Sequence, residues 1–101
     1  MGGLILLQFI ADIYLFKENV GVLPGDGWSG MMPSINLDGE LIASRILSDK
    51  SLTKEEWHEV IIELPYGDKV NSIKEKIKEQ YEFKLNIGGK VLGKGKVKCT
   101  D

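Results

Sequence analysis

Apolar and polar residues alternate along the segment Leu7–Phe16, which is rich in β-branched and aromatic side chains. One face of this segment is apolar at every second position, and the other carries Gln8, Asp12 and Tyr14. A period of two residues is typical of a strand that is buried on one side only. We therefore expect a core strand whose buried face holds Leu7, Phe9, Ala11, Ile13 and Leu15.

The same kind of pattern recurs later in the chain, in the ranges 34–47, 57–64, 81–87 and 90–99. Asp38-Gly39 predicts a turn or bulge within the first of these ranges. Gly88-Gly89 predicts a tight hairpin turn between the last two, because glycine tolerates positive φ angles. Gly93 and Gly95 would permit a bulge or a tight bend in the final strand.

A different period appears at Val70, Ile73 and Ile77, which stand at helical spacing with lysines and glutamates between them. This spacing predicts a short amphipathic helix over 69–79, with Asp68 at the N-cap position. A strand with one charged face is the alternative. Without repeats or linkers, the pattern predicts a single, mainly β domain over residues 1–101.

Composition narrows the class of protein. The chain has 101 residues, of which 43% are hydrophobic and 28% charged, as expected for a globular domain rather than a disordered chain. Its net charge of -2 disfavours nucleic acid as a partner. Lysines nevertheless cluster without any acidic residue between residues 84 and 98, so the candidate RNA contacts are Lys84, Lys90, Lys94 and Lys96.

The sequence offers little for metal or cofactor chemistry. Its one cysteine, Cys99, and its one histidine, His58, make a transition-metal site improbable, and we expect no cofactor. A lone thiol fits the reducing cytoplasm. The apolar start at Met1–Leu7 is too short to span a membrane, and we expect none.

The segment from Lys17 to Pro33 predicts a long loop, because it is rich in glycine and contains two prolines. Long loops in small domains are often functional. Apolar side chains within this loop predict a partner-binding patch made by Val22, Trp28, Met31 and Met32. The alternative is that these side chains fold back over one end of the core.

Two catalytic arrangements were weighed, and both are disfavoured. Asp26, Ser29 and His58 could form a triad by composition, but no ordered motif supports one. The segment Ser29–Ser34 also resembles the Ser-Met-x-Pro box of signal-peptidase-like and LexA-like proteases. That chemistry needs a serine directly before the first methionine, where this chain has Gly30. We expect no enzyme, with a degenerate protease as a remote alternative.

Three blocks of the chain, Phe9–Glu18, Ser29–Ser34 and Phe83–Val97, resemble in the same order parts of the C-terminal β-barrel domain of elongation factor Tu. Phe9–Glu18 is similar to that domain's opening strand, and Ser29–Ser34 is similar to its Ser-Gly-Tyr-Arg-Pro segment. The most specific match is Phe83–Val97, with a Gly-Gly turn and a Gly-x-Gly bend at the family's offsets. The resemblance implies a small closed six-stranded antiparallel barrel without catalytic residues. It also implies contacts with tRNA and with partner proteins.

The arginines of the family's tRNA-contacting positions are missing from this chain. The corresponding residues here are Val20-Gly21-Val22, Met31-Met32 and Asn86-Ile87. Losing arginines removes phosphate contacts, so delivery of tRNA is not expected. The sequence therefore predicts a non-enzymatic module that binds a protein, such as a bacterial immunity or toxin-neutralising protein by analogy of size and charge. An RNA-binding translation-factor-like module is the alternative.

Overall fold

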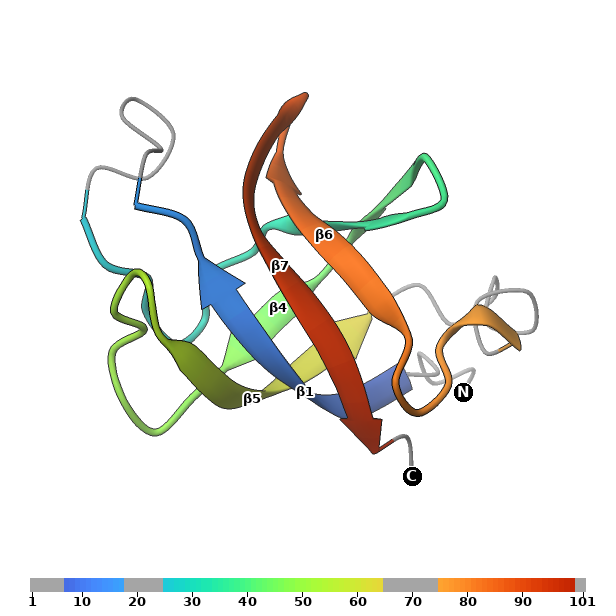
Figure 1. The fold of residues 1–101 in the computed structure, drawn as a ribbon, viewed down its shortest axis with the longest axis horizontal. Coiled ribbons are helices and arrows are strands. Elements are labelled where there is room, and N and C mark those ends of the chain that lie inside the picture. The colour runs from blue at the N-terminus through green and yellow to red at the C-terminus, as the bar shows by residue number, and fades with distance from the viewer. Residues whose placement is uncertain (1–6, 18–24, 65–74, 100–101) are drawn as a thin grey trace, which may run out of the picture.

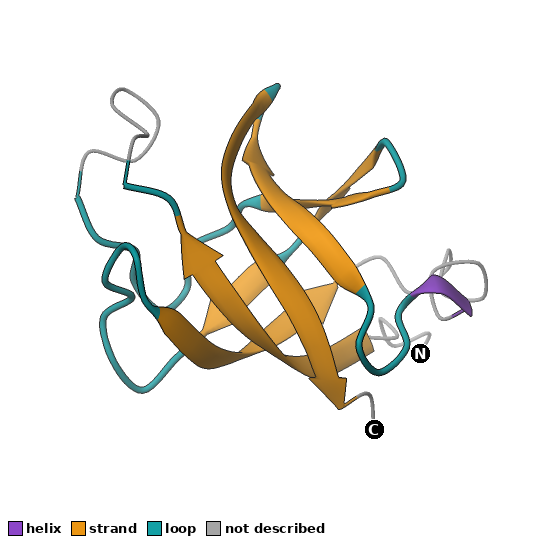
Figure 2. Cartoon of the chain, in the orientation of Figure 1, coloured by secondary structure: helices purple, strands orange, loops and turns teal. Residues whose placement is uncertain are grey.

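The computed structural model describes residues 7–17, 25–64 and 75–99, which form one antiparallel sheet of seven strands (Figure 1). Strands dominate the described chain, and helix is almost absent from it (Figure 2). The strands are β1 (Leu7–Leu15), β2 (Ser34–Leu37), β3 (Glu40–Ala43), β4 (Arg45–Leu47), β5 (Trp57–Leu64), β6 (Glu82–Ile87) and β7 (Lys90–Cys99).

Alternating hydrophobicity explains most of these strands. The strands expected over 7–16, 57–64, 81–87 and 90–99 all form, each within one residue of the expected bounds. Every second side chain of β1 is buried, from Phe9 to Leu15, as the period of two requires. The prediction of a mainly β fold is therefore confirmed.

The sheet has the order β3-β2-β6-β7-β1-β5-β4 and curls into a half-barrel (Figure 1). The closed six-stranded barrel is a wrong prediction, since β3 and β4 are the two ends of the sheet and do not pair with each other. The range 34–47 was expected to continue as one β segment past its turn. Instead the returning strand is interrupted at Ser44, so its first half pairs with β2 and its second half with β5.

Ser44 is fully buried, and both its backbone N–H and its hydroxyl donate to the carbonyl oxygen of Pro33, at 3.1 and 2.6 Å. Just beyond the bend, the backbone N–H of Ile46 donates to Met31 O at 2.9 Å, and the N–H of Gly30 donates to Ile46 O at 2.6 Å. The residues before β2 therefore run beside β4. One bent segment of chain joins the two ends of the sheet covalently.

The turn expected at Asp38-Gly39 connects β2 to β3. Both residues have positive φ, 54° and 95°, which is the backbone of a type I′ hairpin turn. The N–H of Gly39 donates to Asn36 Oδ1 at 2.7 Å and fixes the turn further. The tip of the hairpin reaches the segment before β6, where Lys76 Nζ lies 3.8 Å from Asp38 Oδ2.

The helix expected over 69–79 lies mostly outside the described residues. Within the described part only Glu75 and Lys76 are helical, so the predicted end of the helix is wrong. Ile77 is buried in the core, as its place in the apolar pattern requires. The chain then turns through Gln80, whose φ of 77° is incompatible with a continuing helix.

Two glycines of β7 let neighbouring strands and the aromatic core pack tightly against it. Phe9 and Phe83 meet edge to face, with ring centroids 6.1 Å apart and an interplanar angle of 88°. The Phe83 ring packs directly against Gly95, leaving no room there for a Cβ atom. A Cβ atom at Gly93 would likewise overlap the carbonyl oxygen of Tyr14 on β1.

Gly93→Ala should lower the free energy of unfolding by about 2–3 kcal/mol, because the new methyl group would overlap a backbone oxygen that cannot rotate away. Gly89→Ala, in the same hairpin, is the matched control: its site is open and its φ is not in the left-handed region. That change should stay within about 1 kcal/mol of wild type. Urea unfolding measures both, and equal effects would contradict the packing described.

Candidate binding surface

The outer face of the sheet carries a cross-strand row of aromatic and basic side chains. Tyr14 on β1 is paired with Trp57 on β5 and with Lys94 on β7, and Lys94 is paired in turn with Lys84 on β6. Residues paired across antiparallel strands project from the same face. These four residues are called the aromatic–lysine row below.

The aromatic–lysine row is held together by ring contacts. The Tyr14 and Trp57 ring centroids lie 5.4 Å apart with an interplanar angle of 51°, and the Phe16 ring centroid lies 6.1 Å from that of Tyr14. Lys94 Nζ is 5.4 Å from the Tyr14 centroid and 5.5 Å from the Trp57 centroid. Such cation–π contacts are worth about 0.5–1 kcal/mol each at an exposed site. They fix the ammonium group of Lys94 beside a tryptophan that is still 53% exposed.

A groove of about 420 Å³ lies along this row. Three lysines and one glutamate contribute to its walls, and its complete lining is Trp57, Glu82, Phe83, Lys84, Lys94, Gly95 and Lys96. The groove is therefore locally basic, although the chain as a whole is acidic.

The next row of the outer face is mainly acidic. Asp12 is paired with Glu59 and with Lys96, and Lys96 is paired with Glu82. Lys98 Nζ lies 2.7 Å from Glu59 Oε2, and this hydrogen bond, together with the charges of Asp12 and Glu59, raises the pKa of Lys98. The acidic row therefore lies next to the groove, and Lys96 and Lys98 partly balance its negative charge.

Beyond the acidic row, Ile10 and Ile61 are paired across β1 and β5, and Leu47 is paired with Ile61. Ile61 is 41% exposed, so this apolar row faces outward. A second hollow of about 270 Å³ opens beside it, lined partly by Ser29 and Ser48. The backbone N–H of Ser48 donates to Ser29 Oγ at 3.0 Å, which ties the loop to the end of β4.

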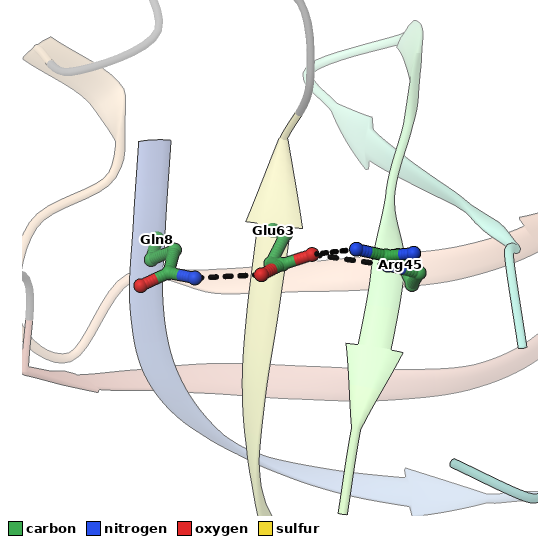
Figure 3. A network of polar contacts seen from close by, with 3 residues as sticks. All are labelled: Gln8, Arg45 and Glu63. Carbon is green, nitrogen blue, oxygen red and sulfur yellow. Dashed lines mark hydrogen bonds and ion pairs between the residues drawn. The ribbon is translucent and has the colours of Figure 1, made fainter. Parts of the chain in front are cut away.

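A polar network of three side chains lies beyond the apolar row, at one end of the outer face (Figure 3). Arg45 on β4 donates through Nε and Nη2 to Glu63 Oε1, at 3.0 and 2.8 Å, and Gln8 on β1 donates to Oε2 at 2.6 Å. These hydrogen bonds from Arg45 and then Gln8 hold the pKa of the Glu63 carboxyl below its ordinary value of 4.5. The network joins three strands and secures the short strand β4 at the end of the sheet.

The structure places the loop residues predicted from sequence in different environments. Trp28 and Met32 are exposed, at 55% and 69%. Met31 is only 3% exposed and belongs to the core, so its assignment to a contact patch is corrected. Its backbone pairs with Ile46 while its side chain packs inward. Val22 lies outside the described residues.

The predicted lysines are also divided. Lys84, Lys94 and Lys96 meet along the groove, whereas Lys90 lies at the β6–β7 turn, paired with Ile87. Tyr14 and Trp57 are candidate contact residues that the sequence alone did not indicate. The available signal was that Tyr14 stands on the polar face of its strand.

The three residues weighed as a triad make their hydrogen bonds elsewhere. His58 Nε2 lies 2.9 Å from Thr53 O, which can only accept, so this nitrogen carries the proton. Ser29 Oγ accepts from Ser48, and Asp26 Oδ1 accepts from the N–H of Lys54 at 3.4 Å. Within the described ranges, no group of three or more metal-ligating side chains comes together.

No protein-family model matches the chain, and no match was found among curated proteins. In the part of the chain that the structure describes, no helix has the length and apolar character needed to cross a membrane.

Glu63→Gln should make stability less dependent on pH in acid. Because the folded-state pKa is lowered, the carboxylate stabilises the fold above pH 4.5, and this contribution is lost as the pH falls through the lowered pKa. Wild type should therefore lose more stability between neutral and acid pH than Glu63→Gln, which begins about 1–2 kcal/mol lower at neutral pH. Urea unfolding at both pH values tests this, with the exposed Glu40→Gln as control. Parallel slopes for wild type and Glu63→Gln would refute it.

Proposed function

We propose that this domain is a non-enzymatic protein-binding module whose contact surface is the aromatic–lysine row and the groove along it. The observation that carries the proposal is that Trp57 is 53% exposed although Tyr14 and Lys94 hold its ring in place. An exposed but ordered tryptophan loses little conformational entropy on binding. Tryptophan and tyrosine are also enriched among the residues that dominate binding energy at protein interfaces.

The rest of the outer face supports this proposal. Apolar, acidic and basic rows follow one another on the outer face, so a partner of complementary charge could be selected by its pattern of charges. Within this proposal, a toxin-neutralising or immunity role in the bacterial cytoplasm is one form, based on analogy of size and charge.

Trp57→Ala should abolish partner capture, because it removes the exposed aromatic anchor of the surface. Trp28→Ala is the matched control, since Trp28 has nearly the same exposure, 55%, but belongs to the loop. We expect retention of partner from lysate to fall about tenfold or more for Trp57→Ala and to be unchanged for Trp28→Ala. The reverse pattern would move the contact surface to the loop around Trp28 and Met32.

RNA binding is the second candidate function. It is the function that the proposed likeness to the elongation factor Tu barrel would imply. The observation that favours it is that Lys84, Lys94 and Lys96 line one groove with the exposed ring of Trp57, which the half-buried Tyr14 ring contacts. Proteins that bind single-stranded nucleic acid use basic grooves with aromatic rings on which bases stack. If this candidate is correct, affinity for tRNA or oligouridine should fall steeply with salt and should weaken in Trp57→Ala. Filter binding at two salt concentrations measures it, and affinity that does not change with salt would exclude it.

A further inference from the structure

Two of the lysines that line the groove, Lys84 and Lys94, stand at paired positions on neighbouring strands. Lys84 and Lys94 are paired in the β6–β7 ladder, so their side chains leave the same face side by side. Among the described residues, the basic partners of ion pairs are Arg45, Lys76 and Lys98, so neither Lys84 nor Lys94 takes part in one. Like charges directly opposite each other destabilise a strand pair. The hairpin therefore bears an electrostatic cost that a bound anion would relieve.

Lys94 is also preorganised. Its ammonium group lies within 5.5 Å of both the Tyr14 and the Trp57 ring centroids, on the side of β7 that faces away from Lys84, and these contacts hold it beside the Trp57 ring. A ligand that enters the groove meets a fixed cation, a neighbouring lysine and the exposed Trp57 ring together. This arrangement suits a carboxylate next to an apolar or aromatic group.

We propose that the groove binds an acidic peptide segment of the partner, with carboxylates on Lys84 and Lys94 and an apolar side chain against Trp57. This inference rests on the proposed protein-binding function and specifies the chemistry of its partner. Charge complementarity supports it, because the groove is a local basic site on a chain whose net charge is -2.

The neighbouring acidic row favours a short peptide over a nucleic acid. Glu82 lines the groove itself, and Asp12 and Glu59 lie in the adjacent row. A continuous polyphosphate strand running across β6, β7 and β1 would meet these carboxylates at close range. A peptide can place its few carboxylates on the lysines and avoid the acidic row.

The test uses the Trp28→Phe variant of the whole chain, so that Trp57 is the sole tryptophan reporter. The probe is a capped peptide of glutamates around one phenylalanine, and its glutamine analogue serves as the uncharged control. We expect a saturable change in Trp57 fluorescence with the glutamate peptide and at least about tenfold weaker binding of the glutamine peptide.

Lys84→Glu, made in the same background, separates binding from stability. It should weaken the glutamate peptide about tenfold or more while raising the melting temperature, because a repulsive pair becomes an attractive one. Lys90→Glu is the matched control, with the same charge change in the same hairpin but outside the groove. Lys90→Glu should change the affinity less than about threefold, and Lys94→Arg should retain binding.

The inference would be overturned by equal binding of the glutamine peptide, by equal losses in Lys90→Glu and Lys84→Glu, or by oligouridine binding more tightly than the glutamate peptide. No response to the glutamate peptide would also overturn it. The capture experiment with Trp57→Ala then separates the two proposals. If Trp57→Ala retains less partner from lysate than wild type although the glutamate peptide does not bind, the protein-binding proposal stands and only the acidic chemistry of the partner is wrong.

Discussion

The register of β1 with its two neighbours is the constraint on which the other features of this domain depend. β1 lies between β5 and β7, and its outward residues Ile10, Asp12 and Tyr14 are paired on both sides. A shift of one residue would turn every side chain of the strand to the opposite face. The buried row from Phe9 to Leu15 excludes such a shift, because it would move these apolar side chains into water. Core packing thereby positions Tyr14 between Trp57 and Lys94.

The strands themselves could be predicted from sequence, since alternation is a local property that reports which face is buried. The open half-barrel could not be predicted, because it depends on the interruption of the returning strand at Ser44. A serine in a β segment carries no local signal for a bend, and the bend is stabilised by a contact with Pro33 that exists only in the folded sheet. The same limit applies to Met31, for which the loop sequence leaves both a surface patch and a place over the core open, and only its pairing with Ile46 decides between them.

The candidate site shows this limit most clearly. Its lysines were noticed because they cluster in sequence, but Tyr14 and Trp57 come from strands far from them in the chain. Only the pairing of β6, β7, β1 and β5 makes them neighbours. Composition shows only that the chain has a net negative charge, whereas the structure shows where some of its basic side chains are concentrated. The sequence therefore indicates the class of the molecule, whereas its surface chemistry requires the register.

The place of β1 in the sheet also has a consequence for biosynthesis. The strand leaves the ribosome first among the seven, yet one of its two neighbours is β7, the last strand to be made. Both hydrogen-bonding edges of β1 can be satisfied only after residue 99 has emerged, which makes the fold dependent on contacts between distant parts of the chain. The row that joins Trp57, Tyr14 and Lys94 is assembled in that final step. A truncated or stalled chain would thus expose the same residues without presenting the surface that they form together.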